Sequence, residues 1–282
     1  MKLSFTTLGC PQWNLDTIIL RAAEYGYDAV DFRGVGVTLD ITTLPEFTVH
    51  GAEVRQRFAD AGLVISGISS SIQVCHAGKR TANLDEAQRT IAVAKGLGCP
   101  NVRIFGGGEV EKVGRGAAAA IGRECIAAIL ALDGAEGMRW LFETHDHWIS
   151  SADCRLLLDA IPNPQFGALW DAGHTTRVGH ELPAHTYATI GPRIGYTHFK
   201  DAVYDPSHSQ AMKDGWRYVL PGTGQLPLAE AMRVLQEGGY DGYLVFEHEK
   251  RWHQNLPEPE VALPAFVQWA RAIKQGWQTR SD

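Results

Sequence analysis

The sequence has no uninterrupted apolar run that approaches the roughly 20 residues of a membrane-spanning helix. Its N-terminal segment carries one lysine but no sustained apolar stretch, so we expect no secretory signal peptide. Positive charge is not in excess, because 26 Lys and Arg residues face 32 Asp and Glu residues, for a net charge of −6. A protein that binds nucleic-acid phosphates needs a basic face, so this balance argues against a dedicated nucleic-acid binder.

Cysteine is also scarce, with five residues in the chain and no Cys-x-x-Cys spacing. An odd number of widely separated cysteines predicts free thiols and argues against both zinc-finger and disulfide scaffolds. We therefore expect a cytoplasmic protein. A Gly-x-Gly-x-x-Gly motif after an early strand is missing as well, which removes the usual sequence fingerprint of a dinucleotide site.

What the sequence does contain is a regular alternation of short β-rich runs with longer helical patterns. The expected strands cover residues 3–8, 28–32, 64–70, 101–105, 139–144, 166–170, 194–199 and 243–246. The expected helices cover 16–25, 51–61, 85–97, 115–132, 152–161, a weak segment after 182, 228–237 and 259–275. Eight strand-then-helix units predict an α/β protein, a single (β/α)8 TIM barrel domain over residues 1–282. In such a barrel the active site lies at the C-terminal ends of the strands.

Polar side chains stand at the ends of the last four expected strands, directly after apolar residues. They are Glu143, Asp171, His198 and Glu247. The carboxyl ends of barrel strands meet at one mouth, so we expect these four groups to converge there. Three carboxylates and one imidazole suit Mn²⁺, Mg²⁺, Co²⁺ or Fe²⁺ better than a structural zinc ion. The pattern therefore predicts a divalent metal site.

The alternation of side chains along a strand extends this site. His145 lies on the same strand face as Glu143, Lys200 lies on the same face as His198, and Arg103 precedes a glycine-rich turn. His174 follows Asp171 closely enough for a loop to fold it over the metal. Arg103, Lys200, His174 and Trp13 are candidate substrate-binding residues. The arginine and lysine could instead pair with structural carboxylates, and Trp13 could cap the barrel.

A divalent ion can chelate adjacent oxygens of a hydroxy-carbonyl compound, acidify the C–H bond between them and stabilise the resulting ene-diolate. Glu143 and Glu247 are expected on strands separated by two others, so their carboxylates could remove and return the proton. His145 is a further candidate base, and geometry decides among the three.

Five short motifs carry a family resemblance: Glu-Thr-His at 143–145, Trp-Asp-Ala-Gly-His at 170–174, Thr-His-Phe-Lys-Asp at 197–201, Pro-Gly-Thr-Gly at 221–224 and Phe-Glu-His-Glu at 246–249. Together they resemble the sugar phosphate isomerase/epimerase family of the xylose isomerase-like TIM barrel superfamily. The resemblance implies that Glu143, Asp171, His198 and Glu247 hold one divalent ion. Mn²⁺ is expected first, with Mg²⁺, Co²⁺, Fe²⁺ or Zn²⁺ as alternatives. The resemblance also implies that Glu143 and Glu247 act as an acid–base pair and that His174 flanks the metal and the substrate.

The leading hypothesis is thus a metal-dependent isomerase or epimerase of a sugar or polyol derivative in carbohydrate metabolism. Thr144-His145-Asp146 departs from the Pro-containing motif of the ketose 3-epimerases and lies closer to the dehydratase and lyase branches. A lyase that shares the enolisation step, inosose dehydratase-like or 3-keto-glycoside-cleaving, is therefore the first alternative. An endonuclease IV-like nuclease and a non-catalytic binding barrel are more distant ones. We expect a small-molecule partner, no nucleic acid and no membrane, and leave homo-oligomer formation open.

Overall fold

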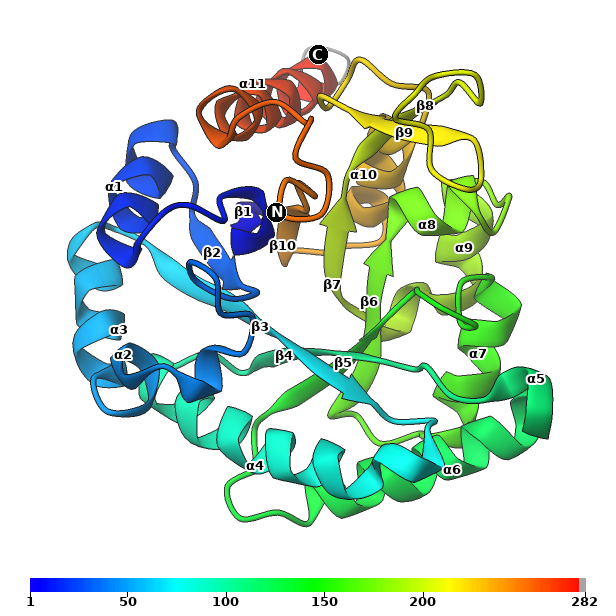
Figure 1. Cartoon of the computed structure of the whole chain (residues 1–282). Helices are drawn as coiled ribbons and strands as arrows, with labels where there is room; N and C mark the ends of the chain where they lie inside the picture. Colours follow the sequence, from blue (N-terminus) through cyan, green and yellow to red (C-terminus); the bar gives the residue numbers. More distant parts are fainter. Residues whose placement is uncertain (279–282) are drawn as a thin grey trace.

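Eight strands close into a barrel in the order β1-β10-β7-β6-β5-β4-β3-β2, and all neighbouring pairs are parallel (Figure 1). The computed structural model describes residues 1–278. The barrel strands are β1 (Lys2–Thr6), β2 (Ala29–Phe32), β3 (Val64–Gln73), β4 (Asn101–Phe105), β5 (Arg139–Glu143), β6 (Phe166–Asp171), β7 (Ile194–Phe199) and β10 (Tyr243–Phe246).

Helices surround this barrel on the outside (Figure 1). The longer ones are α1 (Leu15–Tyr25), α3 (Gly51–Asp60), α4 (Arg80–Leu97), α6 (Arg115–Leu130), α7 (Ser151–Ala160), α9 (Pro183–Ile190), α10 (Leu228–Glu237) and α11 (Pro259–Gln278). Three short helices, α2 (Pro45–Thr48), α5 (Val110–Val113) and α8 (Ala172–Arg177), lie in the connections. The predicted (β/α)8 TIM barrel is confirmed.

Helix α1 illustrates how local sequence sets these bounds. The side chain of Asn14 accepts a hydrogen bond from the backbone N–H of Thr17 at 2.9 Å, which satisfies a free donor of the first turn. Gly26 ends the helix with a φ of 79°, a left-handed conformation that glycine adopts without steric cost. Strands β6 and β7 are buried along their whole length, as expected when helices cover one side and packed side chains fill the other.

A small apolar cluster separate from the main core consists of Leu141, Leu169, Tyr196 and Val245. Each member stands two residues before one of the four polar groups Glu143, Asp171, His198 and Glu247. Because side chains two residues apart share a strand face, each of those polar groups lies one layer above a member of this cluster, toward the carboxyl ends of the strands. We call the four apolar residues the barrel floor.

Some boundaries differ from the sequence-based expectation. Strand β1 ends at Thr6 rather than at residue 8, because Thr7–Gly9 forms a 3-10 turn. Helix α4 begins at Arg80 instead of residue 85, and no side-chain hydrogen bond caps its start. The sequence therefore offers no capping residue that would mark the start of this helix.

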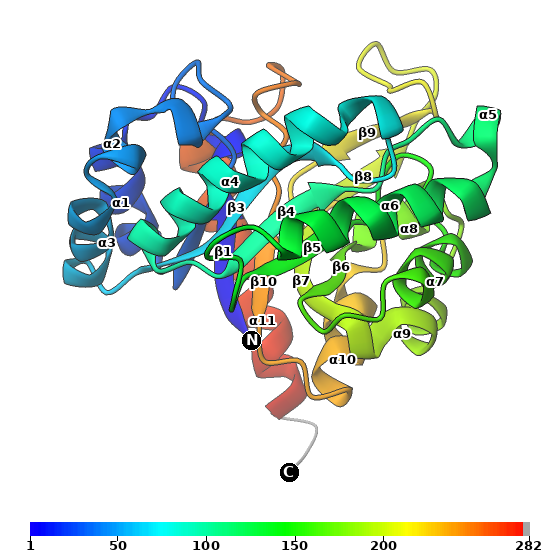
Figure 2. The same ribbon diagram turned by 90° about the horizontal axis from the view of Figure 1, so that it is seen from below.

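An antiparallel hairpin of β8 (Asp201–Tyr204) and β9 (Trp216–Val219) was not predicted. It follows β7 directly and lies on the same side of the barrel as other long loops, opposite the chain termini (Figure 2). The helices within residues 1–278 include none with the combined length and apolar character that crossing a bilayer requires.

Candidate metal centre

Glu143, Asp171, His198 and Glu247 come together at the carboxyl ends of β5, β6, β7 and β10. One ligand atom from each residue can be chosen so that all four atoms lie within 4.8 Å of one another. All four side chains are buried, and none is more than 4% exposed. The structure thus assembles the four groups that the strand-end pattern identified, directly above the barrel floor. We call them the four-residue cluster.

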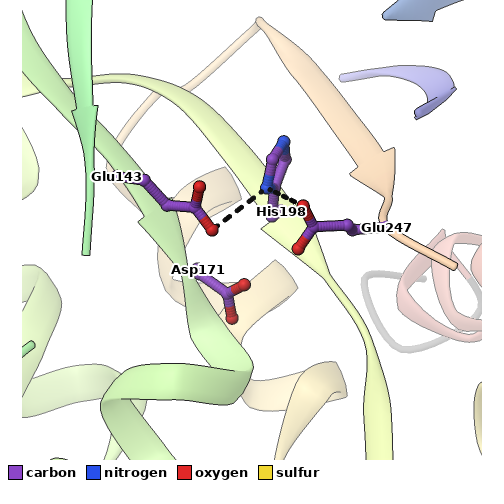
Figure 3. Close-up of side chains that lie close together, drawn as sticks. All are labelled: Glu143, Asp171, His198 and Glu247. Carbon is purple, nitrogen blue, oxygen red and sulfur yellow. Dashed lines mark ion pairs between the residues drawn. The ribbon is translucent and has the colours of Figure 1, made fainter. Parts of the chain in front are cut away.

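His198 lies between the two glutamates of the cluster. Its Nδ1 is 3.2 Å from Glu247 Oε1 and 3.5 Å from Glu143 Oε1 (Figure 3). Burial alone lowers the pKa of His198, but the negative charges of the two nearby glutamates outweigh it and raise this pKa to about 10. In the metal-free protein a protonated imidazole therefore balances part of the carboxylate charge.

Several buried polar atoms of the cluster lack a hydrogen bond of good geometry within the described residues. They include both ring nitrogens of His198, together with Asp171 Oδ2 and Glu247 Oε2, which make ion pairs only. Buried polar atoms are normally satisfied, so such a group of unsatisfied ligand atoms calls for an explanation. A divalent cation accounts for the two carboxylate oxygens and for one ring nitrogen of His198, and three carboxylates with one imidazole are ligands that Mn²⁺, Fe²⁺ or Zn²⁺ accept. The residues fit a divalent ion.

Lys200 supports the cluster from the side of β7. Its ammonium group lies 2.9 Å from both Asp171 Oδ2 and Glu249 Oε1 and also contacts Glu247. Burial lowers the pKa of Lys200, but these carboxylates outweigh burial and raise it well above its ordinary value. The sequence pointed to substrate contact for Lys200, whereas the structure places it among the carboxylates and not on the cavity wall.

A cavity of about 180 Å³ opens onto the four-residue cluster. It is lined by Leu8, Arg33, Arg103, Phe105, Glu143, His145, His174, Glu247, Glu249 and Trp252. Three of the predicted non-ligand residues, Arg103, His145 and His174, are therefore on its wall. The volume equals that of about six water molecules, which suits a compact small molecule and not a polymer.

His145 and His174 form a pair on this wall, with ring centroids 5.0 Å apart. Asp171 accepts a hydrogen bond from the backbone N–H of His174 at 2.8 Å, so a one-and-a-half-turn helix rather than a loop holds His174. Burial and the charge of Lys200 lower the pKa of His174. Burial also lowers the pKa of His145, but the 2.7 Å contact with Asp146 and the charge of Glu143 raise it on balance. The surroundings thus shift the pKa values of the two imidazoles in opposite directions.

Arg103 is 4% exposed, and its Nε lies 3.5 Å from Glu143 Oε2. Its guanidinium also packs over the ring of Phe105, with Cζ 4.0 Å from the ring centroid. Trp13, the fourth predicted substrate-binding residue, lies elsewhere: it belongs to the main core and its indole N–H points to Glu260 Oε1 at 3.3 Å.

Five residues that line the cavity were not among the predicted site residues: Leu8, Arg33, Phe105, Glu249 and Trp252. Glu249 could have been found, since it stands two residues after Glu247 and so continues the alternation used on other strands. Trp252 lies in the loop after β10, where no regular spacing fixes the direction of a side chain.

The Pro221–Gly224 segment is a turn held by Asp201. The Asp201 carboxylate accepts hydrogen bonds from the backbone N–H groups of Gly222 and Gly224 at 2.8 and 2.9 Å. A Cβ atom at Gly224 would clash with the Asp201 carboxylate and would lie 2.7 Å from the backbone oxygen of Ala202, so glycine is required there. This segment does not line the cavity.

Comparison with known proteins places these features in context. The family model described as xylose isomerase-like TIM barrel matches residues 19–273. An inosose dehydratase of Lacticaseibacillus casei is 26% identical over 110 residues, which is 36% of each chain, so the match spans about a third of that relative. The crystal structure of an IOLI protein with a bound zinc atom is 16% identical, with a TM-score of 0.75 over 97% of this chain and 98% of that one. A D-psicose 3-epimerase in the presence of D-fructose is 17% identical, with a TM-score of 0.74 over 97% and 99%.

Proposed function

The chain belongs to the xylose isomerase-like TIM barrel family, and we propose that it is a divalent-metal-dependent isomerase or epimerase of a small sugar or polyol derivative. One observation carries the proposal. Glu143 and Glu247 approach His198 from opposite sides, within a buried cluster that fits one divalent ion and faces a small cavity (Figure 3).

Glu143, Asp171, His198 and Glu247 would hold the ion. When bound, it would supply positive charge to adjacent carbonyl and hydroxyl oxygens of the substrate and so favour an ene-diolate. The carboxylate of Glu143 or Glu247 removes the proton from the hydroxyl-bearing carbon next to the carbonyl group. The opposite glutamate, in its protonated form, delivers its own proton to the other face of the same carbon, which inverts that carbon, or to the neighbouring carbon, which moves the carbonyl. The barrel floor keeps water from reaching the cluster from below.

Further features of the chain support a choice of metal, compartment and metabolic role. An oxygen-rich set with one imidazole favours Mn²⁺, with Mg²⁺, Co²⁺, Fe²⁺ and Zn²⁺ as alternatives. The five cysteines are all free and buried, which supports work in a reducing compartment such as the cytoplasm. A substrate with several hydroxyl groups suits the polar wall and argues for a place in carbohydrate metabolism.

A lyase or dehydratase is the second candidate, and His145 favours it. Elimination needs an acid that protonates the leaving group, and an imidazole with a raised pKa on the cavity wall can serve as one. The partial match to an inosose dehydratase points the same way. A nuclease with several metals is disfavoured, because the four-residue cluster is the one group of this kind found within residues 1–278.

The test is solvent proton exchange. Protein loaded with Mn²⁺ is incubated in D₂O with a panel of keto-sugars and keto-inositols, and proton NMR follows the C–H signals beside the carbonyl. An isomerase or epimerase incorporates deuterium and keeps the carbon skeleton oxygenated, whereas a dehydratase yields an unsaturated product. A chelator and the Glu247→Gln variant should both abolish the exchange. Exchange that persists in both would contradict the proposal.

A further inference from the structure

Two buried arginines stand on either side of the end of β3. Arg33 follows β2, and its guanidinium donates to Ser69 O at 3.2 Å and to Ser71 Oγ at 3.0 Å. Arg103 lies on β4, and its Nη1 donates to Ser70 O at 3.0 Å. Both side chains line the cavity above the four-residue cluster.

The two arginines differ from most buried cations in having few negative partners. Arg33 is 9% exposed, yet within the described residues it makes no ion pair and donates only to neutral oxygens. Arg103 has a single carboxylate contact, at 3.5 Å from Glu143. Burial and the charge of Arg103 lower the pKa of Arg33 to about 10, so its guanidinium stays charged at neutral pH. The carboxylates of Glu86, Glu143 and Asp31 act on Arg33 only through space and make no ion pair with it. A ligand anion in direct contact would relieve the remaining cost of its burial.

The charged groups of the cavity wall, the four-residue cluster and Lys200 point the same way, and this argument rests on the proposed function. The buried Asp31 lies outside this set: it accepts from the Ser69 and Tyr196 hydroxyls, and burial raises its pKa, which favours its neutral form. Four carboxylates, from Glu143, Asp171, Glu247 and Glu249, face three side-chain cations, from Arg33, Arg103 and Lys200. A divalent ion in the four-residue cluster leaves one positive charge in excess. A carboxylate carries one negative charge and balances it, whereas a phosphate monoester carries close to two near neutral pH.

We propose that Arg33 and Arg103 form a carboxylate subsite, so that the substrate is a small polyhydroxy acid. Its acid group binds at the β2–β4 side of the cavity, and its hydroxy-carbonyl end faces the cluster on β5, β6, β7 and β10. Guanidinium groups suit this role because their planar N–H arrays match a carboxylate. The cavity of about 180 Å³ limits the acid to a compact one.

Three flexible probes that differ only at C1 test the subsite: D-sorbitol, D-gluconate and D-sorbitol 1-phosphate. Calorimetry measures their binding to Mn²⁺-loaded and to metal-free protein. We expect loaded wild-type protein to bind gluconate at least about tenfold more tightly than sorbitol, and more tightly than the phosphate. In Arg33→Gln this preference should fall below about threefold, with the bound Mn²⁺ per chain unchanged.

Arg251→Gln is the matched control. Arg251 is also partly buried and donates to a backbone carbonyl, that of Gly36, but it does not line this cavity. It should keep the full preference for gluconate.

Gluconate affinity that is unmeasurable or no better than that of sorbitol would overturn the proposal, as would a preference that survives in Arg33→Gln. Tighter binding of the phosphate would overturn the carboxylate assignment. Protein that retains Mn²⁺ without preferring gluconate refutes the subsite and leaves the proposed function standing. Protein that retains no Mn²⁺ but still prefers gluconate refutes the proposed metal-dependent function and leaves the subsite standing.

Discussion

Replacing Asp171 with asparagine separates metal binding from folding. Asp171 Oδ1 accepts the N–H of His174 at the start of α8, and its Oδ2 pairs with Lys200 at 2.9 Å. Asparagine keeps the shape and the capping oxygen but removes the charge. Lys200 retains Glu247 and Glu249 as partners, so we expect Asp171→Asn to fold with a modestly lower melting temperature.

The expected loss concerns stabilisation by the metal. Mn²⁺ at 100 times its dissociation constant stabilises a folded protein by about 2.7 kcal/mol. Unfolding entropy of about 2.1 cal/mol/K per residue over 282 residues converts this into a rise in melting temperature of about 5 °C. Loss of a direct ligand should weaken binding at least about 100-fold. The same Mn²⁺ concentration then stabilises the variant by about 0.4 kcal/mol, a rise below about 1 °C.

Differential scanning calorimetry with chelator and with Mn²⁺ measures both shifts. Asp40→Asn is the control, because Asp40 also caps a helical turn, by accepting from Thr42 N at 2.9 Å, and is not a member of the cluster. It should keep the full rise. An equal rise in Asp171→Asn and wild type would refute the assignment of Asp171 as a ligand.

Three further outcomes are expected. Burial lowers the pKa of His248 to about 4, so between pH 6.5 and 4 the unfolded chain binds a proton that the folded chain does not. Because of His248, the free energy of unfolding should therefore fall by about 2 kcal/mol between pH 7 and pH 5. Urea unfolding of His248→Gln should not show this decrease. Leu141→Ala should cost about 3 kcal/mol by opening a cavity in the barrel floor, and should also weaken Mn²⁺ binding; an unchanged unfolding free energy would contradict the packing described. His145→Ala should retain Mn²⁺ but lose at least about 100-fold in kcat, and near-normal turnover would remove His145 from the chemistry.

The barrel and its four-residue cluster could be predicted because each depends on a repeated pattern. Strand and helix periods recur eight times, and Glu143, Asp171, His198 and Glu247 each follow an apolar run. A parallel barrel brings equivalent strand ends together whatever the connecting loops do, so their convergence needed no loop geometry.

Features that depend on loop geometry could not be predicted from repeated strand and helix patterns. Trp13 was expected near the cavity, but the 3-10 turn Thr7–Gly9 precedes it, and its indole reaches Glu260 at the start of α11 instead. The β8–β9 hairpin pairs strands that are separated by eleven residues, too far apart for a short-turn pattern to indicate pairing. The number of ion pairs around Lys200 and their scarcity around Arg33 likewise depend on how neighbouring strands are arranged.

The most direct test of the central claim is the metal content of the protein. Wild-type protein and Asp171→Asn are loaded with Mn²⁺, desalted and measured by elemental mass spectrometry. One ion per chain in the wild type and almost none in the variant is the result that the four-residue cluster predicts. No retained ion in the wild type, or about three per chain, would contradict a mononuclear centre.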